Sequence, residues 1–130
     1  MHPTLRSTLI VGALTVLAAV PGRAQSKNLP PGVTPEMIEK GNQIFHGTGL
    51  CFACHGADAK GTVGPNLTDA EWIHSKGTYE EIIKSVTDGV TLEQAKLGKG
   101  PMPPKGGSSI SDDDVKAVAA YVWSLSHTGG

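Results

Sequence analysis

The sequence predicts an all-α domain of about four to five helices. Three segments, 34–46, 78–89 and 111–126, carry apolar residues at helical spacing and begin with a residue typical of a helix N-cap. No segment of any length alternates apolar and polar residues as a half-buried strand would. The 130 residues are enough for one domain rather than two.

Residues 1–24 are predicted to be a signal peptide that is removed and takes no part in the fold. Arg6 lies in a short polar stretch, an apolar run follows from Leu9 to Val20, and the small Ala24 precedes the expected cleavage site. The run has 12 residues, well short of the roughly 20 that cross a bilayer. We therefore expect export to the periplasm. The alternative is that the segment stays uncleaved as a membrane anchor.

A helix is predicted to begin after Thr34, following a linker at residues 25–33 that has no periodicity. Thr34 supplies a capping hydroxyl, and Pro35 suits the first helical position. The apolar positions that share one face are Met37, Ile38, Gly41, Ile44 and Phe45. Because a glycine inside a helix costs about 1 kcal/mol relative to alanine, Gly41 indicates the close approach of another helix.

The next segment, residues 50–56, contains the pattern Cys-x-x-Cys-His at Cys51, Cys54 and His55. On a helical turn, positions i, i+3 and i+4 share one face. The two thiols can therefore form thioethers with the vinyl groups of one porphyrin while the imidazole approaches the iron from the same side. The pattern predicts one covalently attached haem c with His55 as an axial ligand.

Two other chemistries fit this motif less well. A structural zinc site needs four ligands, and the chain has no second cysteine pair. A thioredoxin-like redox pair lies beside a βαβ pattern, which the sequence lacks.

A loop and a short helix are predicted after the motif. Residues 61–67 contain Gly, Pro and Asn and are expected to form the loop. Thr68 or Asp69 is then expected to cap a short helix that holds Trp72 and His74.

The second long helix is predicted to run from residue 79 to Gly89. Thr78 and Glu81 have the spacing of a capping box, and Gly89 is placed to end the helix. Its apolar face consists of Tyr79, Ile82, Ile83 and Val86. Residues 91–109 are rich in Gly, Pro and Lys and are expected to form a loop.

The last helix is predicted to run from residue 111 to about Ser126. Ser111 is the expected N-cap, and the carboxylates of residues 112–114 suit a helix N-terminus. Ile110 and Val115 have the spacing of a hydrophobic staple. The buried face is expected to consist of Val115, Val118, Ala119, Val122 and Leu125.

Met102 is the expected second axial ligand of a haem bound by His55. It lies in the run Gly100-Pro101-Met102-Pro103-Pro104, whose prolines fix the backbone, so that little entropy is lost when the thioether binds iron. The alternative is that Met102 only fills a loop core. Met37 is expected in the core, and the weaker candidates for the iron are His46, His74 and His127.

The composition excludes a polybasic nucleic-acid-binding protein. Without residues 1–24 the chain has 9 Lys against 12 Asp and Glu, a net charge of −3. The remaining 106 residues include only 6 Phe, Trp and Tyr. Small domains of this kind often need a staple, which a covalently held haem would supply.

Together these motifs resemble those of bacterial class I cytochromes c over residues 34–127, which leaves 128–130 as a tail. The matching pieces occur in the order of that family: Gly41 to Phe45, Cys51 to His55, Gly64 to Leu67, the Met102 loop and Tyr121. Two runs, Pro65 to Trp72 and Ser111 to Leu125, also look like cytochrome c subunits of bacterial haem-copper oxidases. A proline directly before the ligand methionine departs from the family pattern.

The resemblance implies a small cytochrome c fold, in which helices wrap around one covalently bound haem. It implies that the Pro65 carbonyl accepts the Nδ1 proton of His55, and that Leu67 packs on the haem. It also implies that the first helix crosses the last near Tyr121. The cofactor-binding residues would be Cys51, Cys54, His55, Pro65, Leu67 and Met102, with His55 and Met102 as the metal ligands.

The implied function is electron transfer rather than enzymatic catalysis, by a periplasmic monohaem c-type cytochrome. With His55 and Met102 both bound, the iron has no vacant position for a substrate. The expected partners are redox proteins, either a respiratory oxidase or a periplasmic dehydrogenase, with membrane contact only through partner complexes and with the chain itself monomeric. The alternative is a haem-based enzyme, or a gas or redox sensor, in which Met102 is displaceable. Lysines near the haem either steer docking or form an ordinary solvated surface: Lys60, Lys96, Lys99 and Lys105.

Overall fold

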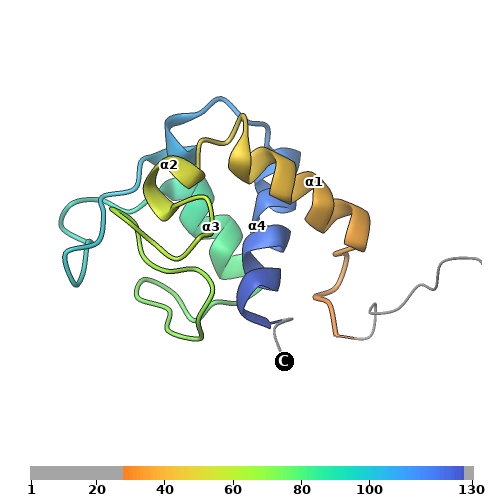
Figure 1. The fold of residues 1–130 in the computed structure, drawn as a ribbon, viewed down its shortest axis with the longest axis horizontal. Coiled ribbons are helices and arrows are strands. Elements are labelled where there is room, and N and C mark those ends of the chain that lie inside the picture. Colours follow the sequence, from red (N-terminus) through yellow and green to blue (C-terminus); the bar gives the residue numbers. More distant parts are fainter. Residues whose placement is uncertain (1–27, 128–130) are drawn as a thin grey trace, which may run out of the picture.

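The computed structural model describes residues 28–127, which form four α-helices and one 3₁₀ helix and contain no named strand (Figure 1). The elements are α1 (Pro35–His46), α2 (Phe52–His55), α3 (Tyr79–Asp88), η1 (Pro104–Gly107) and α4 (Asp112–His127). The all-α prediction is therefore confirmed. Between residues 28 and 127 no helix is both long and apolar enough to cross a membrane. The predicted signal peptide, the start of the predicted linker and the predicted tail lie outside the described residues.

The helices α1 and α4 cross in close contact, and Gly41 lies at the crossing (Figure 1). A Cβ atom on Gly41 would stand 2.0 Å from the carbonyl oxygen of Ala117 and 2.8 Å from the Cβ atom of Tyr121. Only glycine lets the two backbones approach this closely. One turn further along α1, the fully buried Phe45 meets the Tyr121 ring edge-on, with the ring centroids 5.4 Å apart. The helix crossing that the resemblance implies is present.

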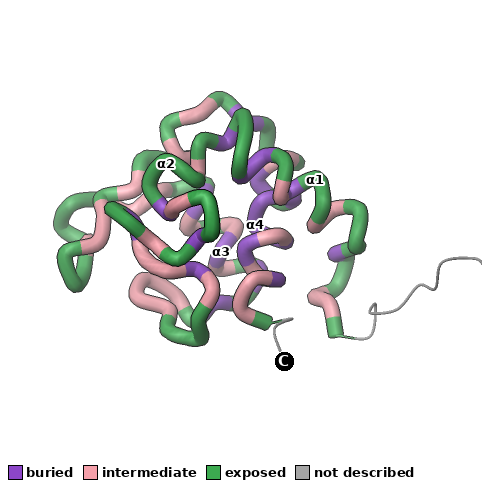
Figure 2. Tube along the Cα trace, viewed as in Figure 1, coloured by how far each residue is buried: buried purple, intermediate pink, exposed green. Residues whose placement is uncertain are grey.

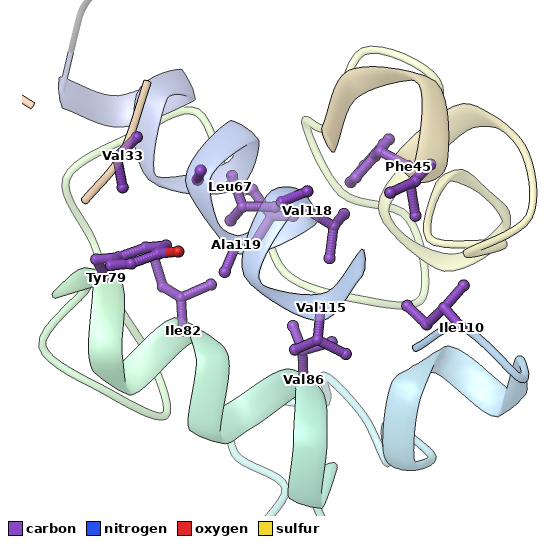
Figure 3. Packing of buried hydrophobic residues seen from close by; sticks show 14 of the residues in the cluster. Val33, Phe45, Leu67, Tyr79, Ile82, Val86, Ile110, Val115, Val118 and Ala119 are labelled. Atoms are coloured by element: carbon purple, nitrogen blue, oxygen red, sulfur yellow. The ribbon is translucent and has the colours of Figure 1, made fainter. Parts of the chain in front are cut away.

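The second long helix, α3, also packs on α4, and buried residues gather along α4 (Figure 2). Tyr79, Ile82 and Val86 point from α3 toward α4 (Figure 3). Val115 of α4 belongs to the same cluster of buried side chains. The Tyr79 hydroxyl donates a hydrogen bond of 3.1 Å to the Lys116 carbonyl of α4. The core is thus a layer of side chains on α4, covered by α1 and α3.

Side-chain caps begin the three long helices at the predicted positions. The Oγ atoms of Thr34, Thr78 and Ser111 each accept the backbone N–H of the third residue along, at 3.2, 3.3 and 3.1 Å. The predicted capping box of α3 forms only in part. The Glu81 carboxylate accepts the N–H of Lys76 at 2.8 Å, not that of Thr78.

The short helix predicted after Thr68 or Asp69 is absent, and residues 68–77 form bends. Asn66 Oδ1 accepts the N–H of Thr68 at 2.8 Å, and Asp69 Oδ1 accepts the N–H of Glu71 at 3.0 Å. Asn and Asp side chains that bond to the backbone two residues on favour turns over helices. The prediction was wrong because the expected caps close turns of their own.

Residues 91–109, predicted to form a loop, contain η1 and two antiparallel bridges. One bridge joins Lys96 to Lys99 within the segment, and the other joins Met102 to Val90. Residues 91–101 lie between the two ends of the Val90–Met102 bridge and project from the molecule (Figure 1). We call them the 91–101 loop. Near its tip Leu97 has a φ of +53° and is 83% exposed.

Candidate functional site

One apolar pocket lies among α1, α3, α4 and the loops that join them. Its walls include buried side chains from all three helices: Phe45, Ile82, Val86, Val118 and Val122. All of the residues predicted to bind a cofactor line it: Cys51, Cys54, His55, Pro65, Leu67 and Met102. The fold therefore brings the predicted site residues together from three separate segments.

The short helix α2 carries both thiols and one imidazole on a single turn. Cys51 is the N-cap of α2, and its carbonyl accepts the N–H of His55 at 3.0 Å. Cys51 is half-buried, Cys54 is exposed, and His55 is only 8% exposed. Because i, i+3 and i+4 share one face of a helical turn, the three side chains approach the pocket from one side.

A hydrogen bond to the Pro65 carbonyl fixes the tautomer of His55. The two atoms, His55 Nδ1 and Pro65 O, lie 2.9 Å apart. Since a carbonyl only accepts, Nδ1 carries the proton and Nε2 keeps its lone pair. Burial lowers the pKa of His55 and so favours the neutral ring. The hydrogen bond to Pro65 has a smaller effect and raises the pKa. A Cβ on Gly64 would stand 2.8 Å from His55 Cε1, so glycine at this position lets the loop lie against the imidazole.

The environment of Cys51 does not favour a reactive thiolate. Burial raises the pKa of the Cys51 thiol to about 11. Redox-active cysteine pairs need a lowered pKa, so a thioredoxin-like role is disfavoured. A thioether, which carries no charge, suits a half-buried position better. In the part of the chain that the structure describes, no three His, Cys, Asp or Glu side chains are grouped so that they could hold a metal ion.

Met102 reaches the pocket from the base of the 91–101 loop and packs, half-buried, against the core. Its N–H donates to the Val90 carbonyl at 2.9 Å, and its carbonyl accepts the Val90 N–H at 2.8 Å. Met37, by contrast, packs against the core from α1 and does not line the pocket. The two methionines thus occupy the positions expected of them.

Of the described histidines other than His55, only His74 lines the pocket, together with Trp72. His127 meets a backbone carbonyl at the end of α4, with Nδ1 2.8 Å from the oxygen of Trp123. His46 does the same at the end of α1. These two imidazoles lie at helix ends, away from the pocket.

His46 contacts two carbonyl groups at once. Its Nδ1 lies 2.9 Å from the Asn42 oxygen, and its Nε2 lies 2.8 Å from the Ala57 oxygen. Only the imidazolium form can donate both bonds. The bond to Ala57, followed by that to Asn42, raises the pKa of His46. In its imidazolium form, His46 therefore fastens the end of α1 to the segment that follows α2.

We expect the stability contributed by His46 to decrease as the pH rises. A folded-state pKa above the unfolded value means that the contribution is complete below the unfolded pKa and is lost as the pH passes the folded one. Urea unfolding of the wild type and of His46→Gln, at about pH 5 and about pH 8, should show the larger difference at the lower pH. Equal differences at both pH values would contradict this assignment.

Two contacts beside the pocket were missed by the sequence reasoning. The Lys99 ammonium donates to the Thr62 carbonyl at 2.8 Å. The Lys96 backbone N–H donates to Nε2 of His74 at 3.2 Å. Both join residues far apart in the chain, and no sequence motif marks such pairs.

The residues of the pocket fit a covalently attached haem. The walls are apolar, two thiols and an imidazole approach from one turn, and a thioether approaches from a separate loop. The Nε2 atom of His55 makes no hydrogen bond to any residue that the structure describes. Imidazole nitrogen and thioether sulfur are the donors that hold haem iron in proteins of this kind.

Comparison with known protein families identifies a match. The model of "Cytochrome C oxidase, cbb3-type, subunit III" matches residues 36–122. The cbb3-type cytochrome c oxidase subunit CcoP of Rubrivivax gelatinosus is 41% identical over 93 residues, which is 71% of this chain and 27% of that protein. Subunit FixP of Rhizobium meliloti (strain 1021) is 36% identical over 94 residues, 70% of this chain and 28% of that protein. The chain thus spans about a quarter of the length of these relatives.

Two solved structures share the arrangement of helices. Cytochrome cL from the marine methylotrophic bacterium Methylophaga aminisulfidivorans MPT superposes with a TM-score of 0.58 at 22% identity, covering 72% of this chain and 56% of that one. Cytochrome cL from Hyphomicrobium denitrificans gives a TM-score of 0.53 at 25% identity, covering 69% and 48%. At the identity of the first, the likeness shows the fold alone.

Proposed function

Because the chain belongs to the family of cbb3-type cytochrome c oxidase subunit III, whose model matches residues 36–122, we propose that it carries single electrons between redox proteins. Its cofactor is one covalently bound haem c. The proposal assigns covalent attachment of the haem to Cys51 and Cys54, and His55 and Met102 would hold its iron. It assigns no substrate to the site.

The proposal rests on one observation: an imidazole and a thioether from separate segments line the same apolar pocket. A haem bound there supplies one-electron exchange between ferric and ferrous iron. Pro65 orients His55 through Nδ1, which keeps Nε2 directed to one ligand position. The thioether of Met102 favours the ferrous state and so raises the reduction potential. The apolar walls exclude water, which acts in the same direction.

We further propose that the protein works in the periplasm beside a respiratory chain. Residues 1–24 have the layout of a signal peptide. The relatives are named as subunits of cbb3-type oxidases, which favours a terminal oxidase over a periplasmic dehydrogenase as the redox partner. Contact with a membrane would then occur through that partner.

Carbon monoxide binding tests this function against a haem-based enzyme or sensor, which needs a vacant or easily vacated ligand position. The reduced wild-type protein is expected to bind carbon monoxide slowly and weakly at neutral pH, because Met102 holds the position. Met102→Ala should bind it rapidly. Stopped-flow absorbance measures both rates, and rapid binding by the wild type would support the alternative.

A further inference from the structure

We propose that Lys99 and His74 are positioning residues, which fasten the 91–101 loop beside the pocket so that Met102 stays at the iron. The proposal rests on the function proposed above, in which Met102 is an axial ligand. It assigns a role to Lys99, which would otherwise be a solvated surface charge, and to His74, which would otherwise only line the pocket.

The 91–101 loop and the ligand methionine share one base. The Val90–Met102 bridge closes the loop, so any movement of the loop acts directly on the backbone of Met102. Apolar packing does little to hold the loop in place, since Leu92 is 71% exposed and Leu97 is 83% exposed. Contacts other than apolar packing must therefore hold the loop in its position.

Two hydrogen bonds join the loop to the rest of the described chain. All of its others are internal, such as those from the N–H groups of Gln94 and Ala95 to the Thr91 carbonyl. The two outward bonds are those of Lys99 with Thr62 and of Lys96 with His74. They end on different segments, so the loop is held at two points.

The hydrogen bond of Lys99 connects the 91–101 loop to the segment that follows α2. Its ammonium donates to the Thr62 carbonyl at 2.8 Å. Thr62 is itself fixed, because its hydroxyl donates to the Cys54 carbonyl at 2.6 Å. A charged donor on a neutral carbonyl is stronger than a neutral pair. Lys99 therefore links the 91–101 loop, which has Met102 at its base, to α2, which carries His55.

The His74 bond is the second point of attachment. Its Nε2 accepts the Lys96 N–H at 3.2 Å, which requires a neutral ring with the proton on Nδ1. His74 lines the pocket and lies in the segment of bends before α3. The Lys96 side chain makes no hydrogen bond to His74, since only the backbone N–H is used, although its charge, after burial, lowers the pKa of His74 and so favours the neutral ring. This separates the effect of a tether from the effect of a nearby positive charge.

Imidazole binding to the oxidised holoprotein tests the role of Lys99. Added imidazole can bind the iron only when Met102 has left, so its apparent affinity reports how often the loop opens. We expect Lys99→Ala to bind imidazole about tenfold more tightly than the wild type. Lys96→Ala loses the same charge from the same loop but keeps both tethers, and should match the wild type. Lys99→Arg, which retains a charged donor, should restore much of the wild-type affinity.

The His74 tether is tested with a pair of variants of similar size. His74→Leu removes the acceptor and should also tighten imidazole binding, whereas His74→Gln keeps an acceptor near the position of Nε2 and should lie closer to the wild type. Thermal unfolding of each holoprotein checks that the fold is retained. The reduction potential, measured on the same samples, should fall in Lys99→Ala and His74→Leu because Met102 binds less of the time.

Failure of this inference can be told apart from failure of the proposed function. If Lys99→Ala and Lys96→Ala have the same imidazole affinity and potential, the tether has no positioning role and the inference is overturned. If Met102→Ala itself leaves both quantities unchanged, Met102 is not a ligand and the proposed function fails first. A change in Met102→Ala, Lys99→Ala and His74→Leu, but not in Lys96→Ala, supports both.

Discussion

Replacing Met102 with alanine is expected to leave the haem attached and to lower its reduction potential. The attachment depends on Cys51 and Cys54, which the substitution does not touch. Loss of the thioether removes the ligand that favours ferrous iron, so the potential should fall by on the order of 0.2 V, within the roughly 0.8 V range that axial ligands control. A redox titration followed by absorbance measures the potential, and the spectrum reports the change of ligand.

Met37→Ala is the matched control for this experiment. It removes the same side chain from a methionine that packs against the core outside the pocket. Its potential and spectrum should equal those of the wild type, although its stability should fall. If Met102→Ala also kept the wild-type spectrum and potential, the iron would have another ligand and the proposed carrier would lose its basis.

The long helices were predictable because their signals are local. Thr34, Thr78 and Ser111 each cap a helix by bonding to the third residue along, within the span that a sequence pattern covers. The buried faces follow from the helical period alone. Gly41 was informative for a related reason, since an unfavourable residue inside a strong helix indicates a close neighbour.

Local signals failed where two local structures competed for the same residues. Asp69 has the chemistry of a helix cap, but it closes a turn with Glu71 instead. The Glu81 carboxylate has the spacing to complete a capping box, but it bonds to Lys76. In both cases the carboxylate accepts a backbone N–H, as expected. Which N–H it accepts is determined by the fold and not by the local sequence.

The candidate site divides in the same way. Cys51, Cys54 and His55 lie within one turn, so their spacing alone predicted a shared face. The Pro65 bond to His55 was expected only through the family resemblance, and the structure contains it at 2.9 Å. The contact of Lys99 with Thr62 had no signal at all, because the residues are 37 positions apart and meet only once the helices have packed.

Gly41→Ala is expected to destabilise the protein by about 2–3 kcal/mol. The new Cβ would stand 2.0 Å from the Ala117 carbonyl oxygen, so α1 and α4 must move apart. The gain of about 1 kcal/mol in helix propensity does not offset this cost. The midpoint of thermal unfolding, followed by circular dichroism of the holoprotein, should fall by about 10–20 °C.

The site of the clash determines what can relieve it. The nearest atoms are the backbone oxygen and carbon of Ala117, so adding Ala117→Gly to Gly41→Ala should not restore stability, and restoration would show that the crossing is looser than described. Gln43→Ala, at an exposed position of α1, should change stability by less than about 0.5 kcal/mol.

Phe45 lies one turn from Gly41 and forms part of the pocket wall. Separating the helices should therefore also admit water to the pocket and lower the reduction potential, which links one glycine in the core to the chemistry of the site.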